Sequence, residues 1–390
     1  MNANSTSRES LALHQKFKGK IEIKSKVQLK NKEDLSLAYT PGVGAVCQEI
    51  AGDKNKLKTY TNVGNSVAVI TDGSAVLGLG NIGPEAAMPV MEGKAILFKE
   101  FAGVDAWPVC LATQEVEEII TTVKNIAPGF AGINLEDISA PRCFEIENRL
   151  QQELDIPVFH DDQHGTAIVV LAGLINALKV VNKNMADITV VITGAGAAGS
   201  AITTLLYQAG VKKYRLVDSK GLICDSRTDL NQAKIDLIKN YVSEDFLCHQ
   251  SDGPLSLAES MVEADVVIGV SGPNTITSDM IKTMNAEPIV FALANPTPEI
   301  MPAEALAGGA SVVATGRSDF PNQINNVLVF PGIFRGLLDA GAKKVTPEIK
   351  IKVAEAIASY IKNPTFDNII PSPFDKKVPE KVAQAVIDNI

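Results

Sequence analysis

The sequence predicts an α/β protein with two domains, each built on a parallel sheet that is covered by helices. Three observations support this. The chain has 390 residues, more than one ordinary hydrophobic core accommodates. Its hydrophobic fraction of 46% and charged fraction of 21% are typical of a globular protein. Short apolar runs alternate with longer helical stretches, and this order favours parallel strands joined by helical crossovers.

The first half of the chain contains the elements of one such sheet. Residues 21–29 alternate apolar and polar side chains, which predicts a half-exposed strand. A loop signal, Tyr39-Thr40-Pro41-Gly42, follows this segment. Apolar runs predict a buried strand at residues 66–71 and further short strands at residues 105–110, 132–135 and 156–159. Helical composition lies between these strands, at residues 85–98, 113–126 and 141–154.

The second half begins after residue 163. Residues 166–181 are apolar on every side, so we expect a buried helix there. Further strands are predicted at residues 188–193, 214–218, 265–270, 289–294 and 311–315. Helices are predicted at residues 197–209, 345–360 and 379–390. We therefore place the two domains at residues 1–163 and 164–390, and expect the helices within 345–390 to pack back on the first domain.

A glycine-rich loop identifies the second domain as a Rossmann-type dinucleotide-binding domain. Gly194, Gly196 and Gly199 follow the pattern Gly-x-Gly-x-x-Gly between a predicted strand and a predicted helix. In this pattern the first glycine makes the tight turn and the second lets the backbone approach the pyrophosphate. The third lets the helix pack closely on the strand. We expect the pyrophosphate to lie on Gly194, Ala195, Gly196, Ala197, Ala198 and Gly199.

The next strand ends at Asp218, which we expect to accept hydrogen bonds from the adenosine ribose and so to favour NAD. Lys220 is close enough to tolerate a 2′-phosphate, and NADP stays an alternative.

Two pairs of acids follow two predicted strands. Glu136-Asp137 follows residues 132–135, and Asp161-Asp162 lies just after residues 156–159. Ligands of parallel sheets bind at the carboxyl ends of the strands. Adjacent ionised acids repel each other unless a counter-charge is present, and Mg²⁺ or Mn²⁺ supplies one through oxygen ligands. Glu136, Asp137 and Asp162 are the predicted ligands, the alternative being solvated surface acids.

His160 and His164 are four residues apart but lack the helix and glutamate of a zinc protease motif, so we interpret them as structural. No Cys-x-x-Cys pair is present either, which argues against a zinc site.

Lys94 and Tyr39 are candidate acid–base residues. Lys94 follows a glycine and precedes an apolar stretch, so burial is expected, and burial near a metal would favour the neutral amine that a base requires. Tyr39 precedes a proline in a loop. Its phenol could serve as a general acid or simply pack in the loop, and the residues alone favour neither.

Composition excludes several classes of partner. A formal net charge of −9 argues against nucleic acid. The N-terminus is polar and lacks the apolar core of a secretion signal. The longest apolar run, residues 166–181, is too short and too polar to span a bilayer. We expect a cytoplasmic protein without a membrane partner.

These motifs together resemble the malic enzymes in their short bacterial form. They occur in family order along residues 10–390, as the segments 34–43, 76–83, 92–95, 134–138, 160–166, 294–299 and 325–332. The resemblance implies an N-terminal catalytic domain, an NAD(P)-binding domain, malate as substrate, Mg²⁺ or Mn²⁺ as metal and a homodimer. The exposed strand expected at residues 21–29 also favours a dimer.

The resemblance also implies roles for individual residues. Glu136, Asp137 and Asp162 resemble the metal ligands. Lys94 resembles the general base, with Asp161 placed to pair with it, and Tyr39 resembles the acid that protonates the enolpyruvate. Asn295 and Asn326 resemble ligands of the substrate carboxylate or of the nicotinamide half of the cofactor.

The sequence departs from the family at one position. Larger eukaryotic members have a substrate-binding arginine just before the Leu-Gly-Leu-Gly loop, and Ala75 stands there in this chain. A lysine or backbone amides would have to bind the carboxylate instead.

The main prediction is oxidative decarboxylation of malate, with oxaloacetate decarboxylation as a related activity. Alternatives are a malolactic enzyme that retains the cofactor, an oxaloacetate decarboxylase without a redox step, an amino-acid dehydrogenase and a catalytically silent dinucleotide sensor.

Overall fold

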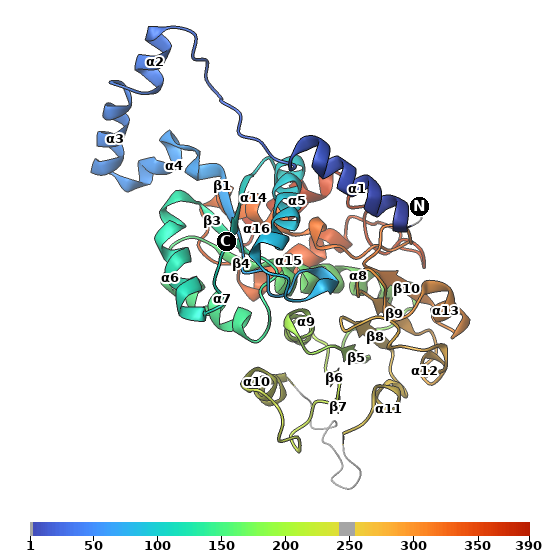
Figure 1. Cartoon of the computed structure of the whole chain (residues 1–390). Coiled ribbons are helices and arrows are strands. Elements are labelled where there is room, and N and C mark those ends of the chain that lie inside the picture. The colour runs from blue at the N-terminus through green and yellow to red at the C-terminus, as the bar shows by residue number, and fades with distance from the viewer. Residues whose placement is uncertain (1–2, 242–253) are drawn as a thin grey trace.

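The computed structural model describes residues 3–241 and 254–390. It confirms the α/β class and the two parallel sheets (Figure 1). The first sheet has four parallel strands in the order β2-β1-β3-β4, which are β1 (Ser66–Thr71), β2 (Asp105–Cys110), β3 (Gly132–Leu135) and β4 (Val158–His160). The helices that connect them are α5 (Pro84–Ala102), α6 (Val116–Ile126) and α7 (Arg142–Glu153). All four predicted strands of this sheet are present, the last shifted by up to two residues.

The second sheet has six strands in the order β10-β9-β8-β5-β6-β7. Five run parallel, and the short β7 pairs antiparallel with β6. The strands are β5 (Thr189–Thr193), β6 (Lys213–Asp218), β7 (Gly221–Leu222), β8 (Val266–Gly269), β9 (Ile289–Ala292) and β10 (Val312–Thr315). Their order reverses between β5 and β8, as in dinucleotide-binding domains.

The second half of the chain contains helices that cover the second sheet and helices that pack back on the first half. They are α8 (Thr166–Val180), α9 (Ala197–Gln208), α10 (Gln232–Tyr241), α11 (Leu257–Met261), α12 (Ser278–Lys282), α13 (Pro302–Ala307), α14 (Phe330–Ala340), α15 (Pro347–Ala358) and α16 (Lys377–Ile387). The prediction that the apolar run at residues 166–181 is too short and too polar to cross a membrane is wrong, because the helical segment 161–180 is long and apolar enough to do so. However, 72% of it is buried inside the molecule. It serves as a core helix here, packed against α9 and α15.

One continuous core joins the two halves. The ring of Phe98 on α5 lies 4.8 Å from that of Phe330 and 5.3 Å from that of Phe334, both on α14. Phe334 also meets Phe159 of β4 edge-on, at 6.1 Å between centroids. Helix α16 packs on α14 and touches α5 as well. The C-terminal helices therefore fix the position of α5.

The N-terminal region differs from the prediction. After α1 (Ala3–Phe17) the chain runs along residues 20–31 without a strand, so the strand expected at 21–29 is wrong. An alternating pattern makes a strand only where a neighbouring strand pairs with its backbone, and these residues are exposed without one in this chain. Three short helices follow, α2 (Lys32–Ala38), α3 (Val43–Gly52) and α4 (Leu57–Tyr60). We refer to residues 20–60 as the arm.

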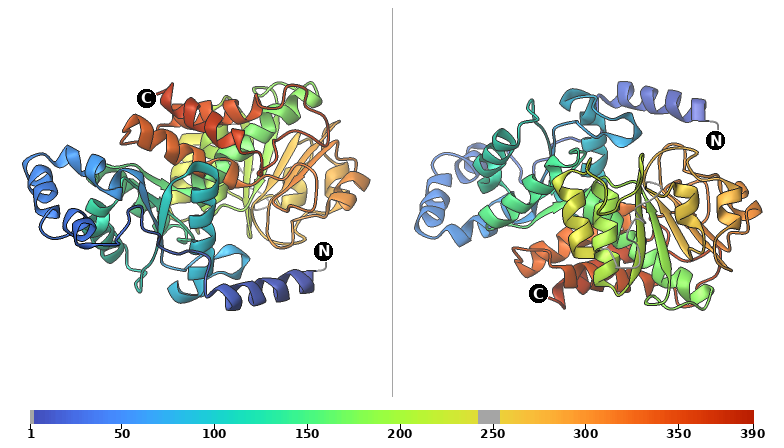
Figure 2. Two further views of the ribbon diagram at one scale, coloured as in Figure 1. Left: turned by 90° about the horizontal axis from the view of Figure 1, so that it is seen from above. Right: turned by 90° about the horizontal axis from the view of Figure 1, so that it is seen from below.

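The arm stands away from the body of the molecule. Figure 1 shows α2 and α3 beyond the first sheet, and in both views of Figure 2 the same blue segment lies at one end of the molecule. It returns to the body through α4 and a 3₁₀ turn, η2 (Asn62–Asn65), which leads directly into β1. The arm thus joins the first sheet at the amino ends of its strands.

Candidate active site

The predicted acids lie at the carboxyl edge of the first sheet. Strands β1 and β3 are neighbours, and the chain leaves them toward opposite sides, to β2 and to β4. Glu136 and Asp137 follow β3, while Asp161 and Asp162 follow β4. The edge where strand order reverses is where α/β proteins bind ligands. The topology alone therefore brings both acid pairs to one place.

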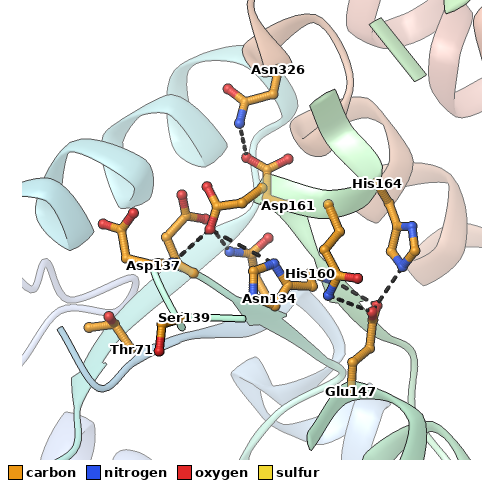
Figure 3. A network of polar contacts seen from close by, with 12 residues as sticks. Thr71, Asn134, Asp137, Ser139, Glu147, His160, Asp161, His164 and Asn326 are labelled. Atoms are coloured by element: carbon orange, nitrogen blue, oxygen red, sulfur yellow. Dashed lines mark hydrogen bonds and ion pairs between the residues drawn. The ribbon is translucent and has the colours of Figure 1, made fainter. Parts of the chain in front are cut away.

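Three carboxylates meet there, as Figure 3 shows in part. Oxygens of Glu136, Asp137 and Asp162 all lie within 4.8 Å of one another, and among the described residues this is the group able to hold a metal ion. The backbone N–H of Asp137 donates to Asp162 Oδ2 at 2.8 Å. Asp137 itself has a φ of +53°, a left-handed conformation that non-glycine residues adopt rarely and often at functional sites.

The electrostatics of this cluster favour a bound cation. Burial, together with the neighbouring Asp162, raises the pKa of Glu136 to about 7. Burial also raises the pKa of Asp162 to about 6, with Asp161 adding to the effect. Lys94 opposes both shifts but does not cancel them. The negative charge of the three carboxylates is thus only partly balanced by Lys94. Mg²⁺ and Mn²⁺ prefer oxygen ligands of this kind and would balance the remainder.

Lys94 reaches this cluster from the middle of α5. Its Nζ donates to Asp161 Oδ2 at 2.6 Å and lies 2.8 Å from Glu136 Oε1. The same nitrogen lies 4.2 Å from the ring centroid of Phe330. Burial alone would lower the pKa of Lys94, but the surrounding carboxylates, Asp161 first, raise it above its ordinary value. Lys94 is thus buried and paired, as the sequence predicted, and it is held by Asp161.

A π-helical turn, η5 (Asp161–Gly165), presents Asp161. Such turns are frequent at functional sites. A Cβ on Gly165 would lie only 2.0 Å from Asp161 Oδ1, so the turn requires a glycine at this position. Asn326 donates to Asp161 Oδ2, the oxygen that also holds Lys94 (Figure 3). The structure therefore brings Asn326 into the cluster.

The two histidines are part of a buried polar network. His164 Nε2 lies 2.9 Å from Glu147 Oε2, and its Nδ1 lies 2.9 Å from Lys350 Nζ. Glu147 also accepts from the backbone N–H of His160 at 3.0 Å. Burial alone would raise the pKa of Glu147, but His164 and Lys350 hold it at about 2. This network holds the ring of His164 between α7 and Lys350, whereas His160 joins it through its backbone N–H.

Glu147 and Asn134 were not predicted from the sequence. Asn134 is buried in β3 and donates to Glu136 Oε2 at 2.9 Å, which orients that carboxylate. A polar residue inside the apolar run Gly-Ile-Asn-Leu was the signal that could have identified it. Glu147 shares the apolar face of α7 with Cys143 and Leu150, and an acid at such a position is a comparable signal.

The glycine loop has the geometry that a dinucleotide requires. A Cβ on Gly194 would meet the carbonyl oxygen of Val270 at 2.4 Å, and one on Gly199 would meet that of Gly194 at 1.8 Å. A Cβ on Gly196 would meet nothing within 4 Å. The first and third glycines are therefore required by packing, whereas Gly196 faces open space. Helix α9 begins at Ala197 without a side-chain cap, so its N–H groups are available to phosphate.

Asp218 ends β6 as predicted, but it is held by cations that the sequence did not reveal. Arg227 donates to it through two nitrogens, at 2.8 and 3.1 Å, and Lys234 Nζ donates at 2.6 Å. Lys220 pairs instead with Asp229, at 2.7 Å. Burial would raise the pKa of Asp218, but Arg227 and Lys234 keep it below its ordinary range. Two cations thus flank the expected ribose site.

Two predicted residues lie outside the acid cluster. Asn295 follows β9, and a Cβ on Gly78 would meet its carbonyl oxygen at 2.4 Å, so it lies where the loop after β1 touches the second half. Tyr39 lies on the arm at the end of α2 and is 66% exposed. No described contact joins Tyr39 to the cluster, although Lys94 and the acids are assembled.

Comparisons with known proteins agree with these observations. The family model of the malic enzyme N-terminal domain matches residues 18–151, and that of the malic enzyme NAD-binding domain matches residues 163–390. The chain is 56% identical over 381 residues to the bifunctional malic/malolactic enzyme of Bacillus subtilis, covering 97% of this chain and 91% of that protein.

Two further relatives cover most of the chain. It is 56% identical to an NAD-dependent malic enzyme of Geobacillus stearothermophilus, with 95% of this chain and 76% of that protein covered. The crystal structure of an NAD-dependent malic enzyme from Thermotoga maritima superposes with a TM-score of 0.92 at 47% identity, covering 97% of this chain and 98% of that one.

Proposed function

The chain belongs to the malic enzyme family, and on that premise we propose that it oxidatively decarboxylates (S)-malate to pyruvate and CO₂ with reduction of NAD. The observation that supports this most directly is the contact of Lys94 with Asp161 and Glu136, beside three clustered carboxylates. A buried amine suits proton abstraction from the malate hydroxyl, and the carboxylates suit a divalent metal.

Separate groups of residues would hold the metal and the dinucleotide. Glu136, Asp137 and Asp162 would hold Mg²⁺ or Mn²⁺, which supplies Lewis-acid stabilisation of the charge that develops on the substrate oxygen. The loop 194–199 would hold the dinucleotide, which would supply the acceptor for the hydride of malate C2.

Lys94 takes the proton of the C2 hydroxyl as the ketone forms. The neutral amine needed for this step is favoured when the charge of the surrounding carboxylates is offset. Asp161 and Asn326 keep the amine in place. The bond between C3 and C4 then breaks, CO₂ leaves, and Tyr39 donates a proton to C3 of the enolate to give pyruvate.

Steady-state kinetics with malate, Mn²⁺ and each cofactor tests this proposal. Net reduction of NAD in step with pyruvate formation is expected. Oxaloacetate decarboxylation is expected as a related activity. A chain that binds NAD but turns over no malate would overturn the proposal and support the sensor alternative.

A malolactic activity is the second candidate, because the Bacillus subtilis relative is named a bifunctional malic/malolactic enzyme. That reaction would convert malate to lactate without net formation of NADH, so product analysis separates the two outcomes.

Replacing Tyr39 should separate protonation from hydride transfer. We expect Tyr39→Phe to reduce oxidative decarboxylation about 10²–10⁴-fold, the usual contribution of a general acid. The variant should also lose tritium exchange at the methyl group of pyruvate. It should still reduce oxaloacetate with NADH, because that step needs no proton at C3. The matched control is Tyr60→Phe, which changes another exposed tyrosine of the arm. Equal loss of oxaloacetate reduction would place Tyr39 in the hydride step instead.

Replacing Asp218 should change cofactor preference. We propose that the wild-type chain prefers NAD, because the Asp218 carboxylate repels a 2′-phosphate and accepts from ribose hydroxyls. In Asp218→Ala, the cations Arg227 and Lys234 lose their partner and become available to a phosphate. The ratio of kcat/KM for NAD to that for NADP should fall by about 10-fold or more. A wild-type preference for NADP would show that these cations already outweigh the carboxylate.

A further inference from the structure

A cavity of about 340 Å³ lies apart from the acid cluster, where helices of both halves meet. Helices α9 and α10 form one side of it, and α7, η5, α8 and α15 contribute the other walls. Of the turn η5, Gln163 and His164 line the cavity, whereas Asp161 does not. Figure 3 shows His164 directed toward Glu147, away from Asn326 and Asp161. The cavity is therefore a separate space behind the turn that carries the acids.

One end of the cavity is formed by Lys350 of α15 and His164 of η5. Lys350 Nζ lies 2.9 Å from His164 Nδ1, and His164 Nε2 lies 2.9 Å from Glu147 Oε2. An ammonium group can only donate, so Nδ1 accepts from Lys350 and Nε2–H donates to Glu147. Within the described part of the chain, this contact uses one of the three N–H groups of Lys350. The other two are available to a ligand in the cavity.

The charge of Lys350 is only partly balanced by its surroundings. Glu147 acts on it through the ring of His164 rather than by direct contact. Burial lowers the pKa of Lys350 to about 8, and the attraction of Glu147 offsets only part of this effect. A cation that is withdrawn from water without a direct counter-charge favours binding of an anion.

Beyond Lys350 the cavity has apolar walls and a polar opening. The apolar lining residues are Phe144, Ala167, Ala201, Leu205 and Leu237. Gln208 and Asn240 are exposed and lie where the cavity opens to solvent. At about 30 Å³ for each water-sized group, 340 Å³ accommodates roughly ten non-hydrogen atoms. An anion with a compact apolar body, such as a single ring, matches this size and this lining.

The charges around the cavity favour a carboxylate over a phosphate. Among the described lining residues, Lys350 is the only lysine or arginine. Lys234, also on α10, is engaged by Asp218 at 2.6 Å. Asp236 contributes a carboxylate to the lining, which would repel a second negative charge. A phosphate dianion would thus be incompletely balanced, whereas Lys350 alone balances one carboxylate.

We propose that this cavity binds a small organic monocarboxylate with an apolar body, whose carboxylate accepts hydrogen bonds from Lys350. The apolar body would lie between α9 and α10, against Ala201, Leu205 and Leu237. The site is separate from the acid cluster and from the glycine loop, so malate and the dinucleotide should bind beside it. It does not depend on the proposed malate oxidation.

Calorimetric titration of the wild-type chain with 3-phenylpropionate tests the site. We expect one bound probe per chain in the presence of saturating malate and Mn²⁺. The neutral 3-phenylpropanamide has the same shape but no charge, and should bind at least about 10-fold more weakly. Saturating NAD should leave the affinity for 3-phenylpropionate unchanged. Absence of binding, or displacement of the probe by malate or by NAD, would overturn the proposal. So would equal binding of the amide or tighter binding of inorganic phosphate.

Three variants locate the probe. Lys350→Gln should raise the Kd for 3-phenylpropionate at least about 10-fold, because the charged donor is lost. The matched control is Lys352→Gln, an exposed lysine of the same helix that pairs with Glu355, and it should bind the probe like wild type.

Thr204→Trp fills the cavity from α9 and leaves Lys350 in place, because the Thr204 hydroxyl donates only to its own helix, at Ser200. It should unfold at about the temperature of wild type and lose the probe. Unchanged binding by Lys350→Gln, or by folded Thr204→Trp, would overturn the proposal.

The titration requires no turnover, so it is separate from the test of the proposed function. A wild-type chain that binds 3-phenylpropionate but does not oxidise malate would keep this site and lose the proposed function. A wild-type chain that oxidises malate but does not bind the probe would keep the proposed function and lose this site.

Discussion

Lys94→Ala is expected to lose malate oxidation by about 10²–10⁴-fold in kcat/KM, the range in which a general base contributes. The same variant should lose reduction of oxaloacetate, because Lys94 handles the hydroxyl proton in both directions of the hydride step. This distinguishes it from Tyr39→Phe, which should retain that reduction. Binding of NAD, followed by quenching of protein fluorescence, should be unchanged, because the glycine loop is untouched.

Two further variants control this result. Lys99→Ala removes an exposed lysine of the same helix that pairs with Asp105, and it should behave as wild type. Lys94→Arg keeps a cation near Asp161 and Glu136 but provides no neutral amine at working pH. It should unfold at about the temperature of wild type and still be inactive. An active Lys94→Arg would show that Lys94 only balances charge.

Asp162→Ala is expected to abolish metal-dependent turnover, with a loss of at least about 10²-fold, since one of the three proposed carboxylate ligands is removed. Removing the metal from wild-type chain with EDTA should have the same effect, reversed by added Mn²⁺. Titration with Mn²⁺, followed by electron paramagnetic resonance, should show a site in wild type that Asp162→Ala lacks.

The matched control is Asp155→Ala, an exposed acid a few residues upstream that pairs with Lys343. This variant should bind Mn²⁺ and turn over malate like wild type. Full activity in excess EDTA would contradict the metal assignment. So would an Asp162→Ala chain that still binds the ion.

Much of the fold and the grouping of the acids could be predicted from local sequence. Strand length, apolar character and turn residues identified every strand of the first sheet, because each is short and three of them, β1, β3 and β4, are fully buried. The convergence of Glu136 and Asp162 followed from a rule of topology: parallel strands end at one edge. The metal and catalytic roles of these residues stay predictions until tested.

What escaped prediction depends on contacts between distant segments. The pattern at residues 21–29 indicates one exposed face but not whether a neighbouring strand is available. Arg227 and Lys234 neutralise Asp218 from a separate stretch of chain, so the sequence showed the carboxylate without its partners. The exposed position of Tyr39 could not be predicted for the same reason, because a sequence motif identifies a residue but does not show where it lies in the fold.

The aromatic contact between the halves limits how this architecture can be recombined. Phe330 contacts Phe98 and also packs against the amine of Lys94, so one ring from the C-terminal part contributes both to the core and to the surroundings of the proposed base. Replacing the nucleotide-binding half with that of a relative would therefore change the packing around Lys94, even if every acid were retained. A chimera would therefore have to keep the packing of Phe330 against both Phe98 and Lys94.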